Sequence, residues 1–196
     1  MYRLFPASIE TLAAAMALIP LFLYLNRWLF PTLRRTAACC MFSLYLSAVY
    51  ALAGLPNILY IRPDPNFNFR LFAYMFSDLD ATLLNVLLFI PLGLALPLLW
   101  KRFGFWWRTA LFGLSASVFI EVLQIFTHRA TDVNDLLTNT LGCLLGFGLA
   151  KVVLHFAPQL PSDSKKELPI ICLLTFLVLF LVQPFLSGFL WNSILL

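Results

Sequence analysis

The sequence predicts an all-α protein: a polytopic transmembrane helical bundle of about six spanning helices, with both termini outside. Of the 196 residues, 62% are hydrophobic and only 11% are charged, which is far more apolar than a soluble domain. Its long apolar runs reach the length of about 20 residues that a helix needs to cross a bilayer. They also lack the alternation of a membrane β-barrel. We therefore expect residues 1–196 to form a single transmembrane domain.

Six apolar segments are long enough to cross the membrane as helices. They begin and end approximately at Pro6–Leu25, Thr36–Leu55, Thr82–Trp100, Trp107–Phe126, Leu136–Phe156 and Leu168–Leu190. The first segment carries Glu10 early and runs into Asn26 without a small-residue cleavage site, so we expect it to be retained rather than removed as a signal peptide.

The distribution of Lys and Arg predicts the orientation. Nine of them lie in the linkers after the first, third and fifth segments, and four lie on the opposite side: Arg3, Arg62, Arg70 and Arg129. Because basic residues concentrate in cytoplasmic loops, this bias places both termini outside. Topology thus accounts for the net charge of +4, and nucleic acid is not an expected partner.

The four cysteines give no metal or disulfide signal. None lies in a CxxC or Cys/His spacing, so we interpret them as small apolar packing residues: Cys39, Cys40, Cys143 and Cys172. No cofactor, metal or oligomeric state is assigned from the sequence.

The longest linker, residues 61–80, is rich in aromatic residues around a single Arg70. Pro63 and Pro65 predict an extended start. We expect the linker to lie in the outer interface, either as an aromatic belt or as a lid over the bundle.

Polar residues gather where the fourth and fifth segments meet the outer side. Glu121, Gln124 and His128 lie at i, i+3 and i+7, on one face of the fourth helix. A second stripe follows one face of the fifth helix and ends in a small-xxx-small pattern that permits close helix contact: Asp132, Asp135, Asn139, Gly142 and Gly146.

The third helix adds Asn85 at a similar depth, within about 10 Å of the outer boundary at 1.5 Å rise per residue. Polar groups are expensive in hydrocarbon, which makes this cluster a candidate functional site. The predicted site residues are Asn85, Glu121, Gln124, Arg129, Asp132, Asp135 and Asn139.

Some of these residues also have a structural interpretation. Asp132 or Asp135 can cap the N-terminus of the fifth helix, where a carboxylate is stabilised by free amide groups. Glu121 lies inside the fourth helix and needs a partner or a proton, and Arg129 is the expected counter-charge. His128 is expected to be a surface residue.

The pattern resembles the VanZ-like family of bacterial membrane proteins. The resemblance rests on Asn85-Val-Leu-Leu-Phe-Ile-Pro-Leu-Gly93, on Glu121-Val-Leu-Gln124, and on the run from Arg129 to Gly142 with Gly146 after it. It covers about residues 67–151. The family often has an acidic residue where this chain has Asn134. The resemblance implies a place in the plasma (inner) membrane of a bacterium and a role in the cell envelope, since the family is named for a member associated with resistance to the glycopeptide antibiotic teicoplanin.

Two functions of different classes follow. The first is a binder of an anionic lipid or lipid-linked envelope precursor at the outer leaflet, with Arg129 and Arg70 facing the phosphate and Asn85, Gln124 and Asn139 bonding the headgroup. The second is a membrane-embedded enzyme acting on a lipid phosphate, with Glu121, Asp132 or Asp135 as general base or as ligands of a divalent cation. A purely structural bundle and a transporter remain as further alternatives.

Overall fold

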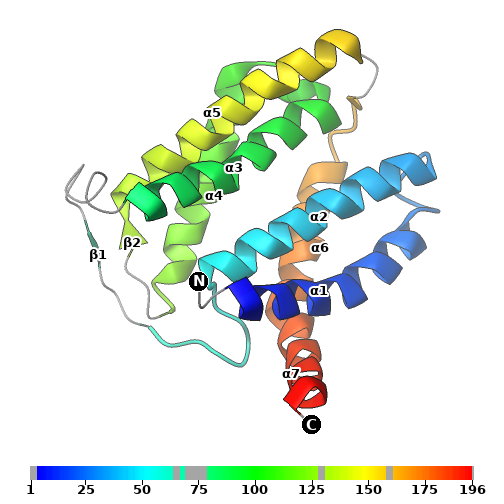
Figure 1. Cartoon of the computed structure of the whole chain (residues 1–196). Helices are drawn as coiled ribbons and strands as arrows, with labels where there is room; N and C mark the ends of the chain where they lie inside the picture. Colours follow the sequence, from blue (N-terminus) through cyan, green and yellow to red (C-terminus); the bar gives the residue numbers. More distant parts are fainter. Residues whose placement is uncertain (1–3, 64–66, 69–78, 128–130, 158–160, 196) are drawn as a thin grey trace. The chain divides into compact units, whose positions relative to one another are not determined.

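The computed structural model describes residues 4–63, 67–68, 79–127, 131–157 and 161–195, and it is almost entirely helical (Figure 1). The chain divides into two compact units. Unit 1 contains residues 1–62 and 165–196, and unit 2 contains residues 63–164. The expectation of a single transmembrane domain stays a prediction.

Unit 1 is built from the first two helices and the last helical run. These are α1 (Leu4–Leu25), α2 (Leu33–Ala53), α6 (Glu167–Leu177), the π-helical turn η2 (Val178–Val182) and α7 (Gln183–Leu195). α1 packs along α2 and against α7, and α2 also contacts α6. The buried side chains of α1 lie mostly on one face, which includes Ala14, Leu18 and Phe22.

Local signals in the sequence set the ends of α2. Thr32 is extended, and its hydroxyl accepts a hydrogen bond from the Arg35 backbone N–H at 3.2 Å, which caps the first turn. Gly54 adopts φ 61° and ψ 49°, the left-handed conformation that ends many helices and that a residue with a Cβ rarely adopts.

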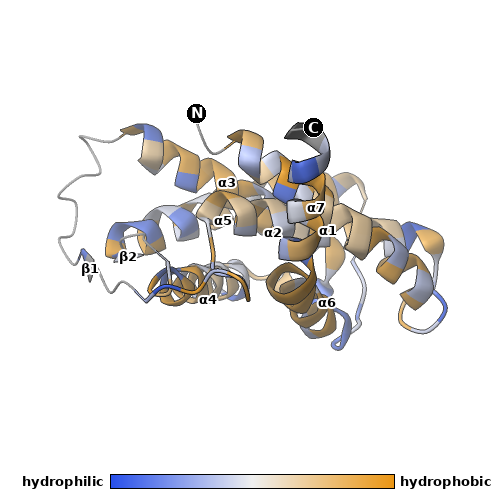
Figure 2. Cartoon of the chain, turned by 90° about the horizontal axis from the view of Figure 1, so that it is seen from below, coloured by the Kyte–Doolittle hydropathy of each residue, from blue (hydrophilic) through white to orange (hydrophobic). Residues whose placement is uncertain are grey.

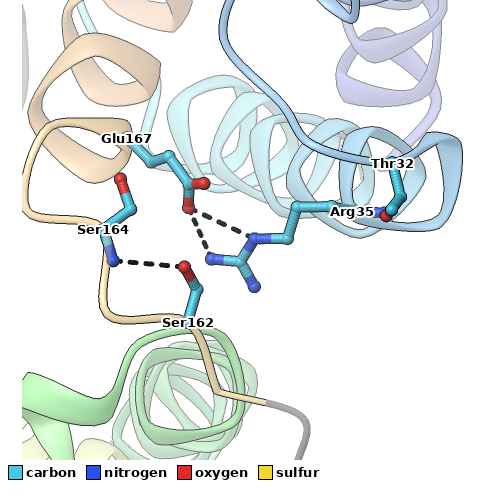
Figure 3. A network of polar contacts seen from close by, with 5 residues as sticks. All are labelled: Thr32, Arg35, Ser162, Ser164 and Glu167. Atoms are coloured by element: carbon cyan, nitrogen blue, oxygen red, sulfur yellow. Dashed lines mark hydrogen bonds and ion pairs between the residues drawn. The ribbon is translucent and has the colours of Figure 1, made fainter.

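An ion pair joins α2 to the start of α6 within unit 1 (Figure 3). Both Nε and Nη2 of Arg35 donate to Oε2 of Glu167, at 3.2 and 2.6 Å. Their side chains are only 10% and 3% exposed. Deeper between the same helices, the hydroxyls of Ser43 and Thr175 lie 2.7 Å apart in a buried hydrogen bond.

The π-helical turn lies just before a proline near the start of α7. Pro184 has no backbone N–H, so it cannot complete the usual bond to the carbonyl four residues earlier, that of Phe180. The Ile58 N–H, from the segment after α2, donates to this carbonyl at 3.0 Å. A distant segment thereby supplies a hydrogen-bond donor in place of the N–H that Pro184 lacks.

Unit 2 carries the polar cluster. It contains β1 (Phe67–Asn68), α3 (Leu79–Leu99), the short 3₁₀ helix η1 (Lys101–Phe103), α4 (Trp106–Gln124), β2 (Thr131–Asp132) and α5 (Val133–Phe156). α3 and α5 form its most extensive helix pair, and α4 packs on α5. β1 and β2 pair in parallel, with Phe67 opposite Thr131 and Asn68 opposite Asp132.

The predicted all-α helical bundle is confirmed, since each of the six apolar segments forms a helix. Among the described residues, five helical segments are long and apolar enough to cross a membrane: Leu4–Leu25, Leu33–Ala53, Leu79–Leu99, Val133–Phe156 and Glu167–Ser193. α4 is not one of these five; it has 19 residues and carries Arg108, Glu121 and Gln124. Most of the 61–80 linker, including Arg70, lies outside the described residues, and the placement of both termini outside stays a prediction.

Candidate functional site: a polar cluster at the start of α5

Glycines bring the backbones of α3 and α5 into direct contact below the cluster. A Cβ built on Gly142 would collide with the Val86 carbonyl oxygen, and one on Gly146 with that of Ile90. From the other side, a Cβ on Gly93 would collide with the Cys143 carbonyl. The predicted close contact at Gly142 and Gly146 is therefore confirmed, and its partner is α3.

α4 approaches the same stretch of α5. A Cβ on Gly113 would lie 2.7 Å from the Cys143 Sγ, and the Cys143 thiol lies 3.5 Å from the Thr109 carbonyl, to which it donates. These contacts determine how α3, α4 and α5 pack together. They therefore also determine the positions of the polar residues, which lie one to three turns away on the same helices.

Glu121 is buried, with 5% of its surface exposed. Its Oε2 accepts a hydrogen bond from the Asp132 backbone N–H at 2.9 Å, and its backbone carbonyl accepts one from the Thr131 hydroxyl at 3.2 Å. The carboxylate therefore ties the end of α4 to the start of α5. Its predicted counter-charge, Arg129, lies outside the described residues, so that pairing stays a prediction.

Asp132 is the N-cap of α5. Its Oδ1 accepts hydrogen bonds from the Asn134 backbone N–H at 2.9 Å and from the Asn134 Nδ2 at 2.8 Å. Its Oδ2 accepts a third bond, from the Asn68 Nδ2 at 2.9 Å. The expectation that one aspartate caps this helix is confirmed, and the second oxygen links the cap to β1.

Asp135 joins α5 to α3. Its Oδ1 accepts a hydrogen bond from the Asn85 Nδ2 at 2.7 Å, and both side chains are partly exposed. Because Asp135 lies in the first turn, its charge also faces the positive end of the α5 dipole. Asn85 thus occupies the place in the cluster that the sequence predicts for it.

A deeper layer lies under these residues. The Asn139 Nδ2 donates to the Ser117 Oγ at 2.8 Å, and this hydroxyl donates in turn to the Asp135 backbone carbonyl at 3.4 Å. Asn139 is 4% exposed, and its Oδ1 is buried with no hydrogen-bond partner in the described part of the chain. Gln124, one turn after Glu121, is buried as well.

The structure therefore brings five of the seven predicted site residues into hydrogen bonds around the first two turns of α5: Asn85, Glu121, Asp132, Asp135 and Asn139. Figure 2 shows hydrophilic residues at the start of α5 beside β2, on helices that are otherwise largely apolar. Gln124 is buried on the same helix as Glu121, whereas Arg129 lies outside the described residues, as does His128.

Four residues that hydrogen-bond within the cluster were not predicted as site residues: Asn68, Ser117, Thr131 and Asn134. Ser117 lies four residues before Glu121 on the same helical face, so the spacing that selects Glu121 could have included it. Asn68 joins the cluster because β1 pairs with β2, and Asn134 joins it because its side chain bonds the N-cap residue Asp132. Neither residue belongs to a helical spacing pattern that could have identified it.

The carboxylates of this cluster accept hydrogen bonds from amide groups. Among the described residues, no group of three or more His, Cys, Asp or Glu side chains is placed to hold a metal ion. What the geometry offers is a set of partly exposed amide and carboxylate groups held in position by a buried layer of hydrogen bonds.

The comparisons with known proteins point to one family. The model of the VanZ/LLP1 family matches residues 5–155, which extends well beyond the motifs of α3, α4 and α5. Over 66 residues the chain is 46% identical to Protein VanZ from Enterococcus faecium, which corresponds to 33% of this chain and 40% of that protein. The chain thus spans less than half the length of this relative, and no solved structure matches. Because the family model covers well over half of the residues, this multi-pass membrane protein belongs to the VanZ/LLP1 family.

Proposed function

We propose that this protein acts in the bacterial plasma membrane, where it binds an anionic lipid or lipid-linked envelope precursor at the polar cluster on the outer side. In this role it contributes to envelope homeostasis or to glycopeptide resistance, including resistance to teicoplanin. One observation carries the proposal: three apolar helices deliver polar groups to one end of unit 2, where they form a single hydrogen-bonded cluster.

The two layers of the cluster suit different roles. Asn85, Asp132 and Asp135 are partly exposed and can meet a ligand, whereas Glu121 and Asn139 are buried beneath them. A buried network that holds partly exposed groups in place reduces the entropy lost on binding. The proposed ligand would exchange hydrogen bonds with the upper layer and leave the lower one intact.

The proposal assigns the positive charge to Arg70 and Arg129, both of which lie outside the described residues. Arg70 follows Asn68 by two residues, and Arg129 precedes Thr131 by two. Asn68 and Asp132 are paired neighbours, so each arginine is close in sequence to a residue of the cluster. A guanidinium binds a phosphate through two parallel hydrogen bonds, which makes an anionic headgroup the favoured ligand.

Native mass spectrometry of the purified protein, released from its own membrane, tests this proposal. Wild-type protein should carry an anionic lipid species, and Arg129→Ala should lose it while still inserting and accumulating. Lys101→Ala is the matched control: Lys101 also carries one positive charge in unit 2, but it follows the opposite end of α3 and pairs with Asp163. The control should retain the lipid.

Growth under teicoplanin, in a host susceptible to the drug, provides the functional measurement. Growth in the presence of teicoplanin should decrease when the host carries the Arg129→Ala variant. It should persist when the host carries Lys101→Ala. An absence of bound anionic lipid in wild-type protein, or its equal retention by both variants, would contradict the proposal. A stoichiometric divalent cation lost on Glu121→Gln would instead support a membrane-embedded enzyme that acts on a lipid phosphate.

A further inference from the structure

We propose that a groove between α1 and α2, within unit 1, binds one acyl chain of a membrane lipid. The groove is open along one side and has a volume of about 460 Å³. The groove lies in unit 1, whereas the polar cluster lies in unit 2. The proposal therefore does not rest on the proposed headgroup site.

Small side chains create the groove. Ala7 and Ala15 of α1 and Ala48 of α2 form part of its wall, where a larger side chain would fill the space. Around them, Leu12 and Leu44 supply apolar surface. None of the described residues that line the groove is charged, so it offers no counter-ion to a polar ligand.

Two lining residues carry hydroxyl groups, and both hydroxyls are already bonded within α1. The Ser8 Oγ donates to the Phe5 carbonyl, and the Thr11 Oγ1 donates to the Ala7 carbonyl, each at 2.7 Å. The groove therefore presents no donor that needs a partner from a ligand. Its apolar lining therefore suits a hydrocarbon chain better than a polar ligand, which would lose hydrogen bonds there.

The length of the groove matches one leaflet. Along α1 it runs from Leu4 to Ala15, which at 1.5 Å per residue is about 16 Å. This is close to half of the hydrocarbon thickness of about 30 Å. The groove also starts at helix ends, since Leu4 begins α1 and Leu52 precedes the last residue of α2. A lipid with its headgroup at the membrane boundary would place one acyl chain along this path.

Photo-crosslinking with a lipid tests the assignment. The full chain is reconstituted in phosphatidylcholine vesicles that contain a trace of phosphatidylcholine with a diazirine in its acyl chain, and labelled peptides are mapped by mass spectrometry. We expect labelling to concentrate on residues 4–15 and 44–52 in wild-type protein. Filling the groove with Ala48→Leu should reduce it to the level of other lipid-facing surfaces.

Ala37→Leu is the matched control, because Ala37 is exposed on α2 but lies outside the groove. Labelling of the groove should be unchanged in this variant. Ala15→Leu fills the groove from the other helix and keeps the test decisive if Ala48→Leu does not fold. Even labelling over all lipid-facing surfaces, or unchanged labelling after filling, would overturn the proposal. Retention of anionic lipid in native mass spectrometry is a separate readout, so either site can fail alone.

Discussion

The backbone contact between α3 and α5 predicts that single methyl groups will destabilise the protein. In Gly142→Ala the new Cβ would collide with the Val86 carbonyl oxygen and lie 3.0 Å from the carbonyl carbon. In Gly146→Ala it would collide with the Ile90 carbonyl oxygen and lie 2.7 Å from the Leu94 nitrogen. Both obstacles are backbone atoms, so relief requires the helices to separate.

Gly148→Ala is the matched control on the same helix. No atom lies within 4 Å of a Cβ built at Gly148, so the methyl group meets open space. Forcing extra volume into a packed contact costs about 1–3 kcal/mol, whereas Gly→Ala at an open helix position gains up to about 1 kcal/mol. A cost of this size corresponds to a decrease of about 5- to 150-fold in the folding equilibrium, since 1.4 kcal/mol is tenfold.

Unfolding by SDS in mixed micelles, followed by tryptophan fluorescence, measures the difference. We expect the midpoint to decrease for Gly142→Ala and Gly146→Ala and to stay level or increase for Gly148→Ala. Gly142→Leu should lower accumulation along with activity, because a larger side chain cannot be accommodated. The reasoning is refuted if all three alanine variants unfold at the same midpoint, since α3 and α5 would then not touch at these glycines.

Three further predictions concern the ion pair, the buried carboxylate and the topology. Arg35→Ala leaves the buried Glu167 carboxylate without its cation and should cost up to about 3–5 kcal/mol of unfolding free energy, much of which Glu167→Ala should restore in the double variant. Glu121→Ala removes the acceptor of the Asp132 amide and should increase its hydrogen exchange by an amount equivalent to about 1–3 kcal/mol, while Glu121→Gln keeps an acceptor oxygen and should change exchange less. In a cysteine-free background, a cysteine at Thr131 should be labelled from outside, and one at Ser164 only after permeabilisation.

Each of these has an outcome that contradicts it. Equal stability of Arg35→Ala and wild type would mean that Glu167 is hydrated rather than buried. Unchanged exchange in Glu121→Ala would show that its carboxylate does not hold the start of α5. Labelling at Ser164 but not at Thr131 in intact cells would invert the topology.

Hydrophobic run length and helical spacing predicted much of the unit that carries the cluster. Runs of apolar residues predicted each helix, because a spanning segment must satisfy its backbone internally. The 3.6-residue period placed Glu121 and Gln124 on one face of α4, and both are buried. The Gly142 and Gly146 spacing predicted a close helix contact, although it could not identify α3 as the partner.

These sequence patterns could not predict contacts between segments that are far apart in the chain. Asn68 meets Asp132 because two two-residue strands pair across more than sixty residues, and strands that short leave no periodic signal. The hydrogen bond from the Asp132 backbone N–H to Glu121 was not predicted either, because every residue except proline has such a group and it leaves no sequence signal. The pairing of Arg35 with Glu167 likewise depends on how α2 meets α6, and it was not predicted.

The Phe180 carbonyl has a consequence for biogenesis. Pro184 prevents the last helical run from satisfying this acceptor in the usual way, and an unsatisfied carbonyl in hydrocarbon costs several kcal/mol. The donor, the Ile58 N–H, leaves the ribosome long before Phe180 is synthesised. The bond from Ile58 therefore forms only after the segment that follows α2 and the last helical run have come together. It adds to the stability of the assembled unit 1 and not to that of the last helix alone.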